Sequence, residues 1–162
     1  EYLLAALNAY ARGDRHSGVM QPLAAGLSDS QRRALALHYA GRSMPARQAV
    51  NRGDAARGRQ IAERGIPALR VPACSACHGP GDAPRNPYYP KLAGQYEDYL
   101  VLQLEVFKEQ HRGGSRYHHL MHPVAARLTP EMMRDVAAFY AALSPVTESR
   151  PSSSPESTSP SR

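Results

Sequence analysis

Cys74-Ser75-Ala76-Cys77-His78 is the stretch of sequence on which the interpretation of this chain depends. It contains the only two cysteines among 162 residues, three positions apart, with a histidine directly after the second. The pattern C-x-x-C-H is typical of covalent c-type haem attachment. Within one tight helical turn, the two thiols can reach the two vinyl-derived carbons on one edge of a porphyrin, and the next imidazole can bind the iron. We therefore predict that Cys74, Cys77 and His78 hold a haem.

Two other kinds of site also use a C-x-x-C pair. Zinc normally takes four Cys or His ligands, and the sequence has no second pair of this spacing. His118, His119 and His122 could supply nitrogens, but their spacing matches no zinc finger or ribbon. A thioredoxin-like dithiol needs a preceding strand, whereas Pro72-Ala73 precedes this pair. Haem attachment is the favoured interpretation, and the dithiol and the zinc site are the alternatives.

The composition favours a small helical protein. Aromatic residues make up only 7% of the chain, Trp is absent, and β-branched residues are few, so a sheet is not expected. The net charge of +6 favours acidic partners or an anionic membrane surface. The basic residues form no block and are not interleaved with aromatics, so no nucleic-acid site is predicted. No segment has the apolar length of a transmembrane helix.

Apolar spacing and capping residues predict five helices outside the haem motif. Helical periodicity is present in residues 1–11 and 96–110. Ser28, Asp54 and Thr129 can each cap a helix, and these helices run to about residues 40, 64 and 143.

The helix that begins after Ser28 has an apolar face of its own. We expect Leu35 and Tyr39 to point inward from it.

An internal repeat is the second strong signal in the sequence. The matching segments are Glu1-Tyr2-Leu3-Leu4 with Asp98-Tyr99-Leu100-Val101, Met20-Gln21-Pro22 with Met121-His122-Pro123, and Tyr39-Ala40 with Tyr140-Ala141. Two copies of one back half are therefore present, but only the second follows a C-x-x-C-H motif. We expect the natural protein to continue upstream of Glu1 with the front half of another domain.

The repeat divides the chain into four predicted parts. Residues 1–44 are the C-terminal half of a first domain, and residues 45–53 are a linker. Residues 54–144 form a complete domain with one haem. Residues 145–162 are rich in Ser and Pro and too poor in apolar residues to fold, so a disordered tail is predicted.

In this order of motifs the sequence resembles tandem di-haem class I cytochromes c, which have two small helical haem domains in one secreted chain. The resemblance covers roughly residues 1–144. It rests on the haem motif, on Pro90-x-Leu92-x-Gly94-Gln95 and on a Met-x-Pro-hydrophobic-Ala pattern. It implies an all-α, class I cytochrome c-like fold with Pro90 beside the haem-binding histidine and Met121 on the opposite face of the iron. One haem c is expected, and a second only if the missing half exists.

Met121 is the predicted second iron ligand because Met20 recurs at the equivalent place before the same proline. A methionine in an Ala-rich segment is more often a core residue that fills gaps. His118, His119 and His122 are rival ligands, although none of them recurs in the first copy, and an open iron position is a further alternative. A His/Met pair would raise the reduction potential. It would also leave no position for substrate, which favours electron transfer over catalysis.

The resemblance implies an electron carrier rather than an enzyme, located in the periplasm because c-type haem is attached outside the bacterial cytoplasm. Its partners would be periplasmic or membrane-bound redox proteins, such as a terminal oxidase or a dehydrogenase. The first alternative is a cytochrome c subunit or domain of a larger dehydrogenase or oxidase complex. A haem enzyme or gas sensor with an open iron and a colourless dithiol protein are the others.

Overall fold

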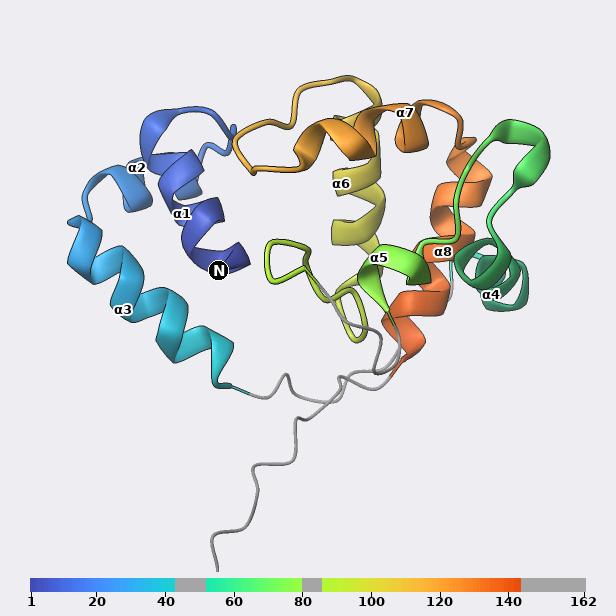
Figure 1. Cartoon of the computed structure of the whole chain (residues 1–162), viewed down its shortest axis with the longest axis horizontal. Helices are drawn as coiled ribbons and strands as arrows, with labels where there is room; N and C mark the ends of the chain where they lie inside the picture. The colour runs from blue at the N-terminus through green and yellow to red at the C-terminus, as the bar shows by residue number, and fades with distance from the viewer. Residues whose placement is uncertain (43–51, 80–85, 144–162) are drawn as a thin grey trace, which may run out of the picture.

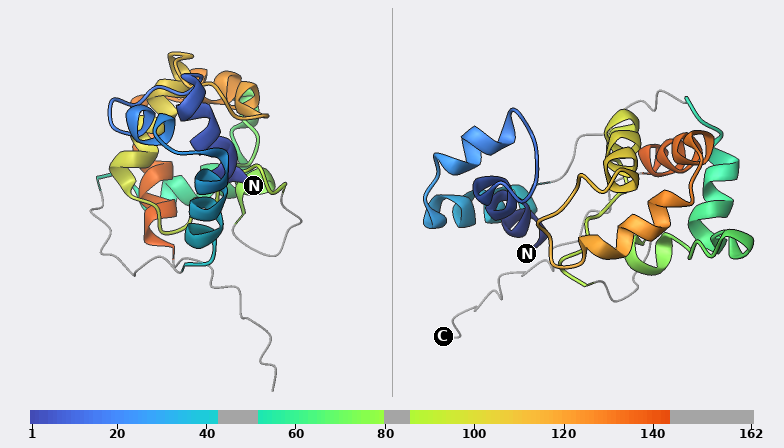
Figure 2. Two further views of the ribbon diagram at one scale, coloured as in Figure 1. Left: turned by 90° about the vertical axis from the view of Figure 1, so that its left-hand side faces the viewer. Right: turned by 90° about the horizontal axis from the view of Figure 1, so that it is seen from above.

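The computed structural model describes residues 1–42, 52–79 and 86–143, and helices account for its regular structure (Figures 1 and 2). Within these residues the β-pairing consists of two isolated bridges, Arg15 with Arg112 and Ile66 with Val71. The expected all-α architecture is therefore confirmed. The elements in chain order are α1 (Tyr2–Arg12), α2 (Met20–Ala25), α3 (Asp29–Ala40), α4 (Ala55–Arg64), η1 (Pro67–Leu69), α5 (Ser75–His78), α6 (Glu97–Lys108), η2 (His118–Leu120), α7 (Met121–Ala126) and α8 (Pro130–Ala142).

The three predicted N-caps begin their helices as expected. The Ser28 hydroxyl accepts a hydrogen bond from the Gln31 N–H, and the Gln31 side chain accepts one from the Ser28 N–H, which completes a capping box. Asp54 accepts hydrogen bonds from the first turn of α4, and Thr129 accepts one from the first turn of α8. These side chains satisfy N–H groups that have no partner within their own helix.

Helices α4 and α8 cross very closely, and a glycine makes this possible. A Cβ atom at Gly58 would lie 1.9 Å from the carbonyl oxygen of Asp135, so no larger residue fits. Asp135 is only 3% exposed. Its carboxylate accepts hydrogen bonds from the Asp54 N–H at 2.7 Å and from Arg57 Nε at 2.9 Å. The start of α4 is thereby joined to the middle of α8.

The second repeat comprises the described residues 52–79 and 86–143, and its core lies between α4, α6 and α8. Its main cluster consists of the buried residues Ala62, Leu100, Val136, Ala137, Phe139 and Tyr140. Cys74 and Leu92 are partly buried and pack against this cluster, so the segments that carry the haem motif and the Pro90 stretch are attached to the same core.

Helix α3 differs from the sequence prediction. Tyr39 is 61% exposed, so the prediction that it points inward is wrong, while Leu35 is half-buried. The reason is that α3 packs mainly against α1, whereas α8 packs against both α4 and α6. An apolar face on a helix becomes buried only where a second element covers it.

The helices of residues 1–42 pack against one another, and those of residues 52–143 form a second group (Figure 1). The predicted linker and tail lie largely in residues 43–51 and 144–162, outside the described residues, so the four-part division stays a prediction. Among the described helices, none has both the length and the hydropathy that crossing a membrane requires.

Candidate functional site

The haem motif forms a single helical turn. Cys74 is the N-cap of α5, Cys77 and His78 are its last residues, and Gly79 ends it with a φ of 74°, which favours glycine. The two thiols are not joined in a disulfide, and Cys77 is exposed. Burial raises the pKa of the Cys74 thiol to about 11. One turn thus presents two separate sulfur atoms and an imidazole, as haem attachment needs.

The imidazole of His78 is oriented by the segment that follows the motif. Its Nδ1 lies 2.9 Å from the carbonyl oxygen of Pro90. A carbonyl can only accept, so Nδ1 carries the proton and Nε2 carries the lone pair that can coordinate iron. A ligating histidine normally makes such a second contact, because it fixes both the tautomer and the ring orientation. The structure therefore brings His78 and Pro90 together in an arrangement that fits haem.

Tyr140 joins both of these segments to α8, and the sequence analysis missed this role. Its hydroxyl donates a hydrogen bond to the carbonyl oxygen of Gly79 at 2.9 Å, and its own carbonyl accepts one from the Gly94 N–H at 2.9 Å. The side chain is 1% exposed. The sequence analysis names Tyr140 only as part of the repeated Tyr-Ala pair, since nothing local in the chain points to contacts so far away.

Met121 begins α7, which lies above α5 in Figure 1. Its side chain is half-buried. Of the rival ligands, His118 donates from Nδ1 to the Ser115 carbonyl, and His122 donates from Nε2 to the Arg112 carbonyl at 3.0 Å. His119 is exposed. The contacts of His118 and His122 each occupy one ring nitrogen, as the Pro90 contact does in His78, so both remain rival ligands to Met121.

The described residues contain no cluster of three or more Cys, His, Asp or Glu side chains that could hold a metal ion. The two cysteines therefore do not form a common metal site with His118, His119 and His122. This arrangement does not support the zinc alternative.

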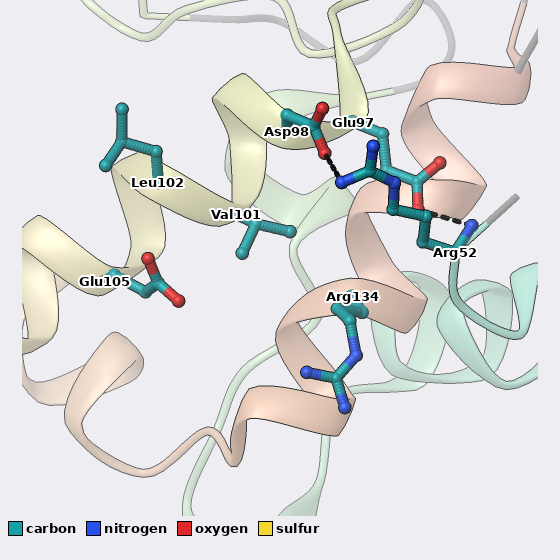
Figure 3. Close-up of a pocket in the computed structure, with 7 residues that line it drawn as sticks. All are labelled: Arg52, Glu97, Asp98, Val101, Leu102, Glu105 and Arg134. Atoms are coloured by element: carbon teal, nitrogen blue, oxygen red, sulfur yellow. Dashed lines mark hydrogen bonds and ion pairs between the residues drawn. The ribbon is translucent and has the colours of Figure 1, made fainter. Parts of the chain in front are cut away.

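A pocket elsewhere on the molecule is shown in Figure 3 and contains none of the predicted haem ligands. Its charged groups are already paired in part: the Arg52 guanidinium lies 2.9 Å from Asp98, and the Arg52 N–H donates to Glu97 at 2.8 Å. The pocket is lined by Arg52, Glu97, Asp98, Val101, Leu102, Glu105 and Arg134.

Comparison with known proteins agrees with the geometry of the motif. Residues 55–144 match the family model described as Cytochrome c. The chain belongs to the cytochrome c family. It is 35% identical over 144 residues to a thiosulfate dehydrogenase electron acceptor from Thiomonas intermedia, an alignment that covers 88% of this chain and 66% of that protein.

Solved structures show the same fold. A cytochrome c4 from Acidithiobacillus ferrooxidans aligns with a TM-score of 0.76 and 31% identity, over 88% of this cytochrome and 83% of that chain. A thiosulfate dehydrogenase from Marichromatium purpuratum aligns with a TM-score of 0.81 and 34% identity, over 92% of this cytochrome but only 32% of that chain. The prediction of a cytochrome related to di-haem proteins is confirmed.

Family membership also bears on cofactor and activity. The family implies a haem c, and the relatives support an electron-transfer cytochrome rather than a catalytic enzyme, as predicted. This cytochrome spans about two thirds of the length of the curated relatives that it matches.

Proposed function

We propose that this cytochrome carries single electrons in the periplasm through one haem c that is attached to Cys74 and Cys77 and ligated by His78 and Met121. The observation that carries the proposal is the contact between His78 Nδ1 and the Pro90 carbonyl. His78 directly follows the second of the two cysteines. The contact with Pro90 leaves Nε2 as the iron-binding nitrogen.

Each residue of the site has a separate task. Cys74 and Cys77 would hold the haem covalently through thioether bonds. His78 and Met121 would supply the nitrogen and sulfur ligands of the iron, and the Pro90 carbonyl holds the His78 imidazole in position. When bound, the haem supplies a one-electron couple, and a His/Met ligand pair places its potential higher than a bis-His pair would.

The relatives suggest the kind of protein that exchanges electrons with this cytochrome. The Thiomonas protein is named as the electron acceptor of a thiosulfate dehydrogenase, and the Marichromatium enzyme contains a region of the same fold. We therefore propose that the electron donor is a dehydrogenase that oxidises a sulfur oxyanion. These two relatives equally support the alternative that the chain is a subunit or domain of such an enzyme. Mixing this cytochrome with a purified thiosulfate dehydrogenase and thiosulfate should reduce its haem, and absence of reduction would contradict the proposed donor.

The ligand assignment is tested by a matched pair of variants, Met121→Ala and Met20→Ala. We expect Met121→Ala to abolish the sulfur-to-iron charge-transfer band, lower the reduction potential and allow carbon monoxide to bind rapidly to the reduced protein. Met20→Ala should leave all three properties unchanged, because Met20 lies in the repeat without a haem motif. Rapid carbon monoxide binding to the wild-type protein would contradict the assignment of Met121.

A further inference from the structure

The two repeats meet in a cluster of five polar side chains, which we call the arginine–tyrosine cluster. Its members are Tyr2, Arg15, Tyr99, Gln103 and Arg112. Arg15 Nη2 donates to the Tyr99 hydroxyl at 3.0 Å, and Arg112 Nη2 donates to the Tyr2 hydroxyl at 2.8 Å. Both guanidinium groups also donate to the Gln103 side-chain oxygen. Each arginine thus binds the tyrosine of the other repeat.

The tyrosines and arginines of the cluster follow the internal repeat, whereas Gln103 corresponds to Ala6. Tyr2 and Tyr99 are equivalent positions, and Arg15 and Arg112 have the same separation in the sequence. The two arginine segments run antiparallel and form a β-bridge with each other.

The aromatic contacts of the two arginines repeat in the same way. The Arg15 guanidinium lies 4.7 Å from the Tyr10 ring centroid, and that of Arg112 lies 4.4 Å from the Phe107 centroid. Such rings stabilise a cation over their face. The tyrosine and arginine contacts of the cluster are therefore made by equivalent side chains of the two repeats, and Gln103 accepts from both arginines.

The charge of the cluster is unbalanced. Arg15 is 6% exposed and Arg112 is 8% exposed, yet neither has a carboxylate oxygen within 4.0 Å among the described residues. Their acceptors are two phenols and an amide, which carry no charge. Burial lowers the pKa of Arg112, whereas the neighbouring tyrosines outweigh burial and raise the pKa of Arg15. A buried positive charge that is not neutralised acts over a longer distance than one in water.

A second contact extends from the cluster toward the haem motif. Tyr2, whose hydroxyl binds Arg112, also donates its backbone N–H to the Pro87 carbonyl at 3.1 Å. Pro87 lies three residues before Pro90, whose carbonyl holds His78. Residues 1–42 therefore contact both α6 and the segment that orients the proposed iron ligand.

We propose that Arg15 of the first repeat acts on the haem site of the second repeat. The buried charge of Arg15 raises the reduction potential of that haem. The inference rests on the proposed haem site. The reduced haem has one positive charge fewer than the oxidised haem, so a buried cation favours the reduced state. Arg112 supplies the equivalent charge from the second repeat.

The test compares Arg15→Gln with Arg15→Lys and with Arg33→Gln in the haem-loaded protein. Arg33 lies on the exposed side of α3 in the same repeat, so its removal changes the net charge equally but in solvent, where salt screens it. We expect Arg15→Gln to shift the midpoint potential downward by several times the shift of Arg33→Gln. Arg15→Lys should restore most of the wild-type potential, because it keeps the charge. Equal shifts for the two glutamine variants would overturn the proposal, and so would a lysine variant no better than glutamine.

Hydrogen exchange supplies a measurement that does not depend on the redox couple. Tyr99→Phe keeps both charges but removes one acceptor of Arg15, and Tyr39→Phe is its control on an exposed site. Tyr99→Phe should increase exchange at the Tyr2 amide, which Pro87 protects, by at least several-fold relative to Tyr39→Phe. Unchanged protection would overturn the coupling. A wild-type spectrum without a Met-ligated haem would instead contradict the proposed function, and the exchange result would still decide the coupling.

Discussion

Helices α3 and α8 occupy equivalent places in the two repeats, but their surroundings differ completely. Tyr39 is 61% exposed on α3, whereas the equivalent Tyr140 is 1% exposed on α8. Both helices begin with a hydroxyl cap, Ser28 in one and Thr129 in the other. The two helices therefore begin with the same kind of cap. What buries Tyr140 is the presence of α4 and of the haem motif, which only the second repeat has among the described residues.

The largest expected effect comes from removing these two tyrosines in turn. Tyr140→Ala should lower the free energy of unfolding by about 3–5 kcal/mol, because it leaves a cavity beside α4 and removes the hydrogen bond to Gly79. Tyr39→Ala should change it by less than about 0.5 kcal/mol, as expected for an exposed site. Denaturant unfolding of the haem-loaded protein measures both values. Equal losses would show that residues 1–42 bury Tyr39 against something in solution.

The second comparison concerns how closely the helices approach. Gly58→Ala should cost at least about 2 kcal/mol, since the new Cβ would collide with the Asp135 carbonyl and push α4 away from α8. Gly18 is the control in the first repeat, because a Cβ there would have no atom within 4 Å, and Gly18→Ala should be close to neutral. Thermal unfolding separates the two variants. A neutral Gly58→Ala variant would mean that α4 can shift without loss.

The smallest expected effect is a pH dependence of α4, because its cap Asp54 is a carboxylate that accepts hydrogen bonds from the first turn. Hydrogen bonds from the Arg57 and Ala56 N–H groups lower the pKa of Asp54. The stabilisation is present above the unfolded pKa and is lost as pH falls through the lower folded value. Replacing Asp54 with Ser should therefore flatten the stability curve between about pH 5 and about pH 2. Ser28→Asp should introduce the same dependence into α3, and unfolding midpoints at several pH values check both variants.

Much of the architecture could be predicted from the sequence because its signals are local. The motif at Cys74 to His78 and the caps Ser28, Asp54 and Thr129 each act within one helical turn, and all three predicted caps are confirmed. The contact of His78 with Pro90 was expected only from a family resemblance. Nothing in the periodicity of that segment indicates it.

The remaining features depend on contacts between distant segments. Tyr140 reaches Gly79 across the fold, and Arg15 reaches Tyr99 across the two repeats. The exposure of Tyr39 was predicted wrongly for the same reason, since the helix pattern shows an apolar face but not whether another element covers it. A comparison of the two repeats would have located Arg15 and Arg112 as an equivalent pair, but not their contact.

The setting of Cys74 has a consequence for the order of events during maturation. The thiolate is the reactive form of a cysteine, and in the folded chain the raised pKa of Cys74 keeps this thiol almost entirely protonated at neutral pH. The Cys74 thiol is therefore a weaker nucleophile in the folded chain than in an unfolded one, and we expect thioether formation to be faster before the helices enclose it.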